Sequence, residues 1–302
     1  MERSNFKVRH KLISGLRDLK IKGGGVLSRF LSIILIPKPK GKIIISTLHG
    51  FDLIINPKED RGVERILYYT GTYEKGILYL MDKFLRKGDA FIDVGANIGL
   101  MSIYGSILVG PDGKVLSFEA NPDTKEILDR NIKLNNRSNI MSSGLALGSQ
   151  MSKGKIYVNW NIGRGGASLI QSSENKDAFD VDIIRFDNFQ TIPEKIRLVK
   201  VDIEGFELEA LKGFGSFLKG NSAPILILES SNNRDNFNST KEDLYDFIKE
   251  INLYKIYKLE HGKEKISKLV EVNYKSELPN HDNIVCLLGD HLSSINQDLF
   301  VN

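Results

Sequence analysis

Hydrophobic and polar positions along the chain follow two periodicities that alternate. Short apolar runs bounded by turn residues predict buried strands, at residues 90–96, 114–121, 196–205 and 223–230. Apolar positions three or four residues apart predict helices after the first three of these strands, at 97–110, 122–136 and 206–220. Pro122 fits the first turn of the second helix. This alternation predicts an α/β fold in which a mostly parallel sheet carries helices on both faces.

Two additions to the sheet are expected from strand-like runs without helices between them. Residues 153–186 contain two such runs around a Gly/Ser/Asn-rich loop and predict an inserted β-hairpin. The runs at 253–260 and 283–289 are expected to pair antiparallel at one edge of the sheet.

The N-terminal third has its own pattern. Residues 41–57 predict a hairpin around a His-Gly turn, and residues 74–89 have helical spacing. We therefore expect three parts, in the order of a basic N-terminal extension at 1–40, an N-terminal hairpin and helix at 41–86, and the α/β domain at 87–302.

Charge separates the extension from the rest. Residues 1–42 carry 11 basic and two acidic side chains, which leaves 31 basic against 36 acidic in the remainder. The share of hydrophobic residues, 41%, is that of a globular protein. The single cysteine, Cys286, excludes an internal disulfide and suits a cytoplasmic protein.

The apolar stretch at residues 26–37 of the extension is too short to span a membrane. Arg29 interrupts it and Pro37 ends it, whereas a spanning helix needs about 20 apolar residues. No cleavage pattern of a secretory signal follows it. Two interpretations stay open, namely a helix docked on the globular domain and a basic amphipathic segment that makes peripheral contact with anionic membranes.

The stretch FIDVGANIG, residues 91–99, runs from a strand into a glycine turn. It carries Gly95 and Gly99 but has Asn97 where a dinucleotide-binding loop would have another closely approaching glycine. Glu119 lies 20 positions after Gly99, the offset at which an acid binds ribose hydroxyls.

Two carboxylates at these strand ends, Asp93 and Glu119, do not suit a pyrophosphate. They suit S-adenosylmethionine, which offers ribose hydroxyls, an amino group and a sulfonium cation. We expect Glu119 to bind the ribose, Asp93 to hold the amino group directly or through water, and Asn97 with the loop N–H groups to bind the methionine carboxylate. A dinucleotide, and a turn that binds no ligand, are the alternatives.

Three more carboxylates lie at later strand ends. Asp202 and Glu204 follow one strand and Glu229 ends the next, so all three are expected to converge and supply a catalytic base for methyl transfer to a hydroxyl. The cluster also suits Mg²⁺, which we do not favour because Ser230 stands where an adjacent second ligand is expected. For Glu204, capping of a helix that starts at Gly205 is the alternative.

Four stretches together resemble one known family. GTYE, FIDVGANIG, VLSFEANP and VDIEGFELEALKG are similar, in this order, to motifs of the FkbM-type methyltransferases, and the resemblance covers about residues 66–230. It implies a Rossmann-like, mostly parallel seven-stranded sheet and an S-adenosylmethionine-dependent O-methyltransferase (EC 2.1.1.-) that acts on a hydroxyl of a glycan, glycolipid or related natural product. It places these residues at the cofactor: Tyr73, Glu74, Asp93, Gly95, Asn97, Gly99, Glu119, Ala120 and Asp202.

Two other functions stay open. The basic extension and the pI of about 8.9 suit an RNA methyltransferase, but VDIEG stands where enzymes that grip a flipped base carry an Asn-Pro-Pro-Tyr-like motif. A non-catalytic S-adenosylmethionine-binding module would keep the loop and Glu119 as well. Trp160, beside a glycine-rich loop, is expected to pack, with stacking on a sugar as the alternative. No nucleic acid partner is favoured, and none of the scattered histidines is expected to catalyse.

Overall fold

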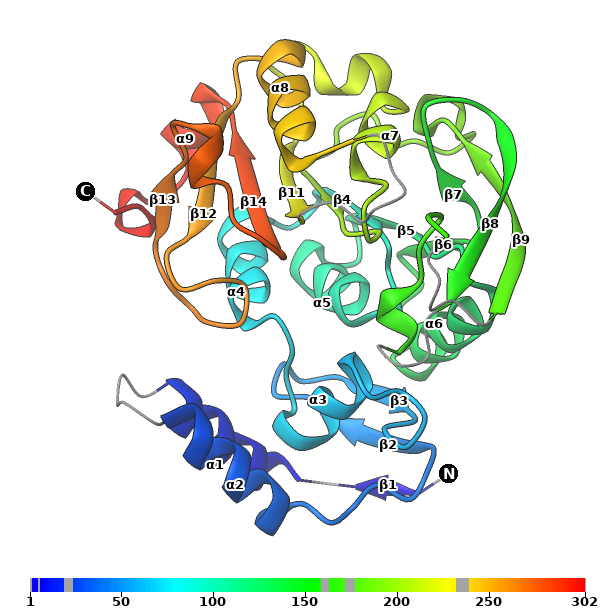
Figure 1. The fold of residues 1–302 in the computed structure, drawn as a ribbon, viewed down its shortest axis with the longest axis vertical. Helices are drawn as coiled ribbons and strands as arrows, with labels where there is room; N and C mark the ends of the chain where they lie inside the picture. The colour runs from blue at the N-terminus through cyan, green and yellow to red at the C-terminus, as the bar shows by residue number, and fades with distance from the viewer. Residues whose placement is uncertain are drawn as a thin grey trace.

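The computed structural model describes residues 2–4, 6–18, 24–158, 163–171, 177–231 and 239–301 (Figure 1). Within these residues, a central sheet of eight strands organises the molecule. Its strands are, in spatial order, β13 (Leu269–Glu271), β12 (Lys255–Leu259), β14 (Asp282–Leu287), β11 (Ile225–Ser230), β10 (Leu198–Val201), β4 (Ala90–Val94), β5 (Lys114–Phe118) and β6 (Ile140–Ser143).

The direction of the strands confirms the predicted parallel sheet with an antiparallel edge. Strands β6, β5, β4, β10 and β11 are parallel, and β14 and β12 join antiparallel. The expected number of strands was one too low, because β13 pairs antiparallel with β12 and extends the edge. The chain builds outward from β4 to β6 and then returns to place β10 beside β4. Strand order therefore reverses between β4 and β10, the position at which open α/β sheets bind ligands.

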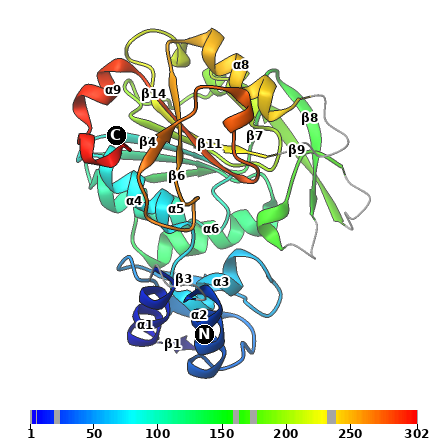
Figure 2. The ribbon, with the colours of Figure 1, turned by 60° about the vertical axis from the view of Figure 1, so that its left-hand side comes forward.

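Helices cover both faces of the sheet, as predicted. Alternate residues of β4 enter different cores: Phe91 packs with Ile77 and Leu80 of α4, whereas Ile92 packs in the core that contains Leu208 and Leu244. Figure 2 shows α4, α5 and α6 on one side of the sheet and α8 on the other. The helices around the sheet are α4 (Lys75–Phe84), α5 (Leu100–Val109), α6 (Pro122–Leu134), α7 (Glu207–Lys212), α8 (Lys241–Ile251) and α9 (Gly289–Ser294).

The helix expected over residues 206–220 is shorter than its periodicity indicates. It ends at Lys212, and the chain continues as a 3₁₀ turn, η3 (Gly215–Leu218). Gly215 has φ +54°, which an α-helix does not allow. A Cβ at Gly213 would lie 2.2 Å from the carbonyl oxygen of Gly148, so the end of α7 packs directly on another backbone segment.

The predicted inserted hairpin is present and has gained a third strand. β8 (Ser152–Val158) and β9 (Asp177–Ile184) pair antiparallel, and β7 (Ala146–Leu147) adds in parallel to β9. The described part of the connection between β8 and β9 contains a 3₁₀ turn, η1 (Arg164–Gly166). The remaining 3₁₀ turns are η2 (Phe186–Asn188), η4 (Lys275–Glu277) and η5 (Gln297–Leu299).

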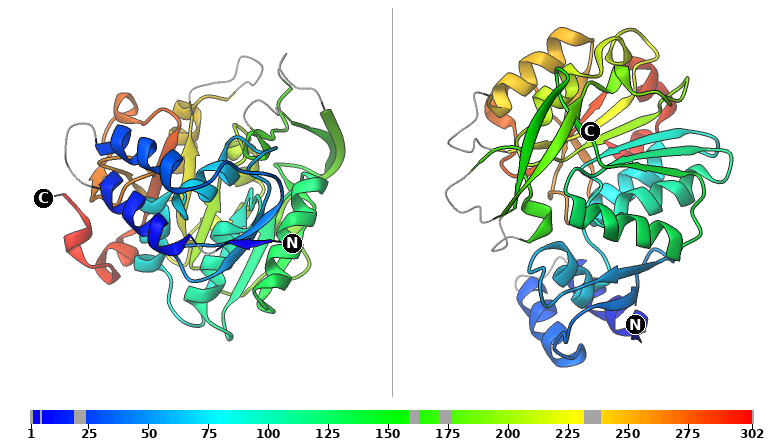
Figure 3. Two further views of the ribbon diagram at one scale, coloured as in Figure 1. Left: turned by 90° about the horizontal axis from the view of Figure 1, so that it is seen from below. Right: turned by 90° about the vertical axis from the view of Figure 1, so that its right-hand side faces the viewer.

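The N-terminal elements lie together below α5 and α6, as Figure 3 shows. The predicted hairpin is confirmed, with Ile43 of one strand opposite Ile55 of the other. Its turn glycine, Gly50, has φ +86°. A two-residue strand that the sequence did not indicate joins it in parallel. The elements of this part are β1 (Arg3–Ser4), α1 (Lys7–Asp18), α2 (Gly24–Leu35), β2 (Ile43–Ser46), β3 (Asp52–Ile55) and α3 (Val63–Thr70).

The basic extension folds as two helices that dock on α3. Ile13 of α1 is fully buried, and the imidazole of His10 hydrogen-bonds the carbonyl oxygen of Tyr68 over 2.9 Å. None of the helices in the described ranges has the length and apolar character needed to cross a membrane. The three-part division at residues 40 and 86 stays a prediction.

Candidate functional site

A cavity lies at the carboxyl ends of β4, β5 and β10, where strand order reverses. It brings together segments that are far apart in the sequence. Of the residues expected at the cofactor, the following line it: Tyr73, Glu74, Gly95, Asn97, Glu119, Ala120 and Asp202. Asp93 and Gly99 lie behind its wall. A Cβ at Gly99 would meet Leu128 at 2.7 Å, so this glycine lets α5 pack against α6.

Gly95 allows two strand ends to approach closely. Its φ of +82° is unfavourable for other residues, and a Cβ would lie 1.9 Å from the backbone oxygen of Asp202. The loop after β4 therefore passes directly beside the end of β10. Asn97 also has positive φ, +50°, a conformation that Asn tolerates better than most residues.

Glu119 ties the glycine loop to the end of β5. Its two carboxylate oxygens accept the backbone N–H groups of Asn97, over 2.8 Å, and Asn121, over 2.9 Å. Burial raises the pKa of Glu119 to about 7, although both hydrogen bonds favour the ionised form. The side chain is held in place at the cavity wall before any ligand binds.

Asp93 is fully buried beneath the loop. One carboxylate oxygen accepts the Ser102 hydroxyl over 2.5 Å, and the other, Oδ1, has no hydrogen-bond partner among the described residues. Burial raises the pKa of Asp93, and the nearby Lys200 ammonium opposes this shift. Of the two routes expected for Asp93, direct contact and contact through water, its position behind the wall favours the second.

The three later carboxylates converge, as their positions at strand ends indicated. Asp202, Glu204 and Glu229 each place a carboxylate oxygen within 4.8 Å of the others. The capping role considered for Glu204 is wrong, because α7 begins at Glu207 rather than at Gly205. Glu207 itself stabilises this turn, since its carboxylate accepts the backbone N–H groups of Ile203 and Gly205, each over 3.0 Å.

Two lysines that the sequence reasoning missed lie among these carboxylates. Lys200 Nζ is 2.9 Å from Asp202 Oδ2, and Lys263 Nζ is 2.9 Å from Glu74 Oε1. Both lysines line the cavity, and Lys200 is 3% exposed. The sequence could have indicated Lys200, because it is a charged residue within a strand that is otherwise apolar. No sequence pattern indicates Lys263, because it comes from the turn between β12 and β13.

Two carboxyl groups of this cluster have pKa values shifted in opposite directions. Burial alone would raise the pKa of Asp202, but Lys200 and Lys263 outweigh it and hold the pKa at about 2. Burial raises the pKa of Glu229 well above its usual value, and repulsion from Asp202 and Glu207 adds to this shift. At neutral pH, Asp202 is therefore a carboxylate, whereas Glu229 keeps its proton to a higher pH than an ordinary carboxyl group does.

This charge arrangement bears on the metal alternative. Three carboxyl groups could offer oxygen ligands to Mg²⁺. The ammonium group of Lys200 already contacts one Asp202 oxygen, and burial raises the pKa of Glu229 well above its usual value. A divalent cation would have to compete with an ammonium group for Asp202 and to bind beside a carboxyl group that is harder to ionise than usual, so these residues fit it poorly.

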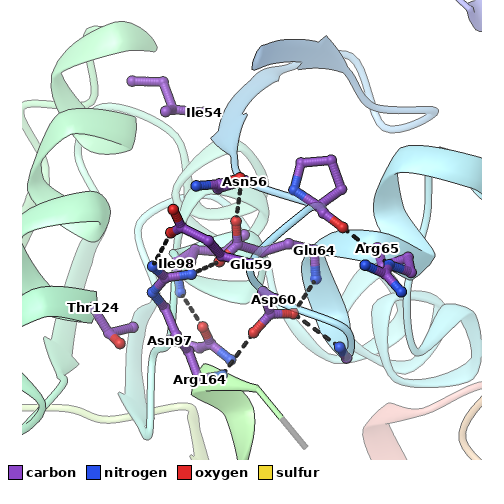
Figure 4. A network of polar contacts seen from close by, with 12 residues as sticks. Ile54, Asn56, Glu59, Asp60, Glu64, Arg65, Asn97, Ile98, Thr124 and Arg164 are labelled. Atoms are coloured by element: carbon purple, nitrogen blue, oxygen red, sulfur yellow. Dashed lines mark hydrogen bonds and ion pairs between the residues drawn. The ribbon is translucent and has the colours of Figure 1, made fainter. Parts of the chain in front are cut away.

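Arg164 joins the inserted hairpin to the N-terminal part at the rim of the cavity (Figure 4). Its guanidinium pairs with Glu64 of α3 over 2.8 Å and with Glu59 over 3.4 Å. Its backbone N–H donates to Asp60 over 2.6 Å. Nothing in the sequence reasoning indicated this network. Trp160, considered there for sugar stacking, lies outside the described residues.

The fold and this set of strand-end side chains define a Rossmann-like methyltransferase. The model of a protein family described as "Methyltransferase FkbM domain" matches residues 93–264, which are more than half of the chain. The chain therefore belongs to the FkbM family of S-adenosylmethionine-dependent methyltransferases, which confirms the resemblance of its motifs.

Relatives of this chain include methyltransferases of differing origin. Methyltransferase sdnD of Sordaria araneosa is 31% identical over an alignment of 155 residues, with a coverage of 40% of this chain and 59% of sdnD. Hexuronic acid methyltransferase AglP of Haloferax volcanii is 28% identical over 157 residues, which are 52% of this chain and 62% of AglP. The chain thus spans about three fifths of the length of these relatives. The structure of an FkbM methyltransferase from Methylobacillus flagellatus KT aligns at 15% identity with a TM-score of 0.43, over 93% of this chain and 59% of that one.

Proposed function

We propose that this protein is an O-methyltransferase that transfers a methyl group from S-adenosylmethionine to a hydroxyl of a sugar, in a glycan or glycolipid. One observation carries the proposal: the ionised carboxylate of Asp202, held by Lys200, lies in the same cavity as the glycine loop and Glu119. A proton acceptor and a nucleoside-binding acid at one edge of the sheet are what methyl transfer to a hydroxyl requires.

The residues at the cavity fit the cofactor. Glu119 faces the cavity as the acceptor for the ribose hydroxyls. The loop N–H groups expected to bind the methionine carboxylate are not available, because those of residues 95–99 all donate to acceptors within the protein. The side-chain amide of Asn97 is therefore the donor in this loop that suits the methionine carboxylate. Buried Asp93 has an oxygen without a partner in the described chain and suits the amino group through water. When bound, S-adenosylmethionine supplies a methyl group on a sulfonium, activated toward displacement.

Asp202 performs the proton transfer in this proposal. Its carboxylate accepts a hydrogen bond from the acceptor hydroxyl and thereby directs an oxygen lone pair toward the methyl group. As the new O–C bond forms and the S–C bond breaks, the hydroxyl proton becomes strongly acidic, and Asp202 takes it. A carboxylate with a pKa of about 2 is basic enough for this late transfer. Glu229 lies beside Asp202, with carboxylate oxygens of the two groups within 4.8 Å of each other, and its raised pKa makes it the weaker candidate for the proton acceptor.

The carbohydrate acceptor is supported by one relative. AglP, 28% identical over 157 residues, is a hexuronic acid methyltransferase. The cavity also carries Lys263 and Tyr73, polar groups that can contact sugar hydroxyls. Burial, with repulsion from Glu74, raises the pKa of Tyr73 and keeps it a neutral hydroxyl.

The test is a transfer assay with S-adenosylmethionine that carries a labelled methyl group. Extracted glycans, glycolipids and RNA are incubated separately with the protein and with Asp202→Asn as the inactive control. We expect label in the glycan or glycolipid fraction, in a form that resists alkali as a methyl ether does. Label in RNA, or label in no fraction despite S-adenosylmethionine binding, contradicts the proposal and favours one of the two other functions.

A further inference from the structure

Helix α2 exposes its apolar side. Five large apolar residues of this helix are between 49% and 76% exposed: Val26, Leu27, Phe30, Ile33 and Ile34. Their spacing places them on one side of the helix, in a continuous stripe. We call this stripe, together with the exposed Val8 and Leu12 of α1, the apolar face.

The opposite side of α2 carries both polar and apolar residues. Ser28 and Ser32 are 5% and 6% exposed, and Leu35 is partly buried and packs against the core. A surface helix of a soluble protein normally buries its apolar stripe and exposes its polar residues. Helix α2 packs Leu35 against the core but leaves a whole stripe of large apolar side chains exposed, so this stripe calls for an apolar environment outside the protein.

Exposed basic side chains flank the residues of the apolar face in the sequence. On α1, Lys7 and Lys11 are exposed and lie one turn apart, in the row next to Val8 and Leu12. Three further exposed lysines follow α2: Lys38, Lys40 and Lys42. Figure 3 shows α1 and α2 side by side at the end of the molecule, where they pack against each other.

We infer that the apolar face binds the surface of a membrane that contains anionic lipids. The two helices lie parallel to the membrane plane, with the apolar stripe among the upper acyl chains and the lysines at the lipid phosphates. Helix α2 has 12 residues, a length that suits this position and not a span across the bilayer. A protein partner would also cover the apolar stripe. The exposed lysines favour a membrane instead, because their positive charge is complementary to that of lipid phosphates. The inference does not depend on which acceptor is methylated.

The test uses the full chain and vesicles of equal parts phosphatidylcholine and phosphatidylglycerol. We expect the protein to sediment with these vesicles, less with pure phosphatidylcholine, and less at high salt. Phe30→Glu should weaken binding about tenfold or more, because a buried aromatic side chain is replaced by a charge. Lys11→Glu combined with Lys40→Glu should weaken binding by a similar factor and reduce the effect of vesicle composition and of salt on the binding that remains.

A matched control is Leu253→Glu, which changes an 88% exposed leucine far from these helices in the sequence. It should bind vesicles like the parent protein. Calorimetry with S-adenosylmethionine confirms that each variant is folded. The inference is overturned if the parent protein stays in the supernatant, or if Leu253→Glu loses as much binding as Phe30→Glu. It is also overturned if the parent forms a dimer that Phe30→Glu dissociates, since the face is then an interface between copies.

Discussion

Lys200 and Asp202 form an ion pair over 2.9 Å between side chains that are two positions apart at the end of β10. In a strand, such residues point to the same face of the sheet. Burial by itself lowers the pKa of Lys200, but the carboxylates of Asp202, Glu74 and Asp93 outweigh it and raise the pKa. Both members of the pair are thus charged at neutral pH inside the protein, and each buried charge is stabilised by the other.

Removing the lysine should destabilise the protein. Lys200→Met leaves buried Asp202 without its closest cation, and we expect a fall of about 3–5 kcal/mol in the free energy of unfolding, measured with urea. Lys255→Met is the control, because its pair with Glu271 is exposed and should contribute less than about 1 kcal/mol. Equal losses of unfolding free energy in Lys200→Met and Lys255→Met would show that Asp202 does not need the charge of Lys200.

The two carboxyl groups of the proposed catalytic pair should respond differently to amide substitution. Asp202→Asn removes the proton acceptor, and we expect kcat to fall about 10²–10⁴-fold with little change in S-adenosylmethionine affinity. Glu229→Gln keeps the shape of the side chain at a position that does not line the cavity and whose pKa is raised, so its kcat should fall much less. Rate assays at saturating cofactor decide this, and a parental rate for Asp202→Asn would place the chemistry elsewhere.

Chelation should leave the activity intact. Lys200 supplies positive charge to the cluster, so we expect the same rate in the presence and absence of EDTA. Loss of activity with EDTA and its recovery with Mg²⁺ would show that the cluster of Asp202, Glu204 and Glu229 holds a metal after all.

Cofactor affinity should depend on pH through Glu119. Its pKa is about 7 in the free protein, and ribose hydroxyls bond more strongly to the ionised form. Affinity should therefore fall as pH is lowered through 7, by at most about tenfold per pH unit. Glu119→Gln should bind more weakly at about pH 8 and lose this dependence, because it carries no ionisable group.

Calorimetric titrations at several pH values measure both effects. Glu126→Gln, an exposed change on α6, is the control and should keep the affinity and pH profile of the parent. A pH profile in Glu119→Gln that matches the parent would assign the titration to another group.

Two effects of a side chain at Gly95 on stability can be measured separately: the steric clash with the neighbouring strand and the unfavourable backbone conformation. Gly95 and Gly50 have similar φ, +82° and +86°, but a Cβ meets backbone at 1.9 Å at Gly95 and nothing within 4 Å at Gly50. Gly50→Ala should therefore cost only about 1–2 kcal/mol of stability, the cost of the left-handed conformation. Gly95→Ala should cost more than about 4 kcal/mol, because β4 and β10 must also separate. Thermal unfolding of both variants measures the difference.

Much of the fold followed from hydrophobic periodicity, and the missed elements explain its limits. The strands β4, β5, β10 and β11 are apolar runs buried on both faces, so they were predicted. β6 has the sequence IMSS with one buried residue and gave no such signal. β1 has two residues and exists only because β2 offers it an edge to pair with. Short or polar elements are stabilised by tertiary contacts, which the hydrophobic periodicity of the sequence does not indicate.

The site was predictable where it depends on strand ends and not where it depends on loops. The convergence of Asp202, Glu204 and Glu229 follows from parallel topology alone. Lys263 and Arg164 reach the cavity from segments whose position is set by long-range packing, through their pairs with Glu74 and Glu64. The electrostatic division between Asp202 and Glu229 could therefore not be derived before the lysines were placed.

The position of β4 between β5 and β10 affects how the chain can fold during synthesis. Phe91 of β4 pairs with Leu198 of β10, about 100 residues later in the chain. Until the ribosome has released β10, β4 is an edge strand with unpaired backbone groups and apolar neighbours, which can pair with other chains. The edge of the sheet that lines the cavity is therefore completed only after the inserted hairpin has emerged, and a chain truncated before Leu198 should aggregate rather than bind cofactor.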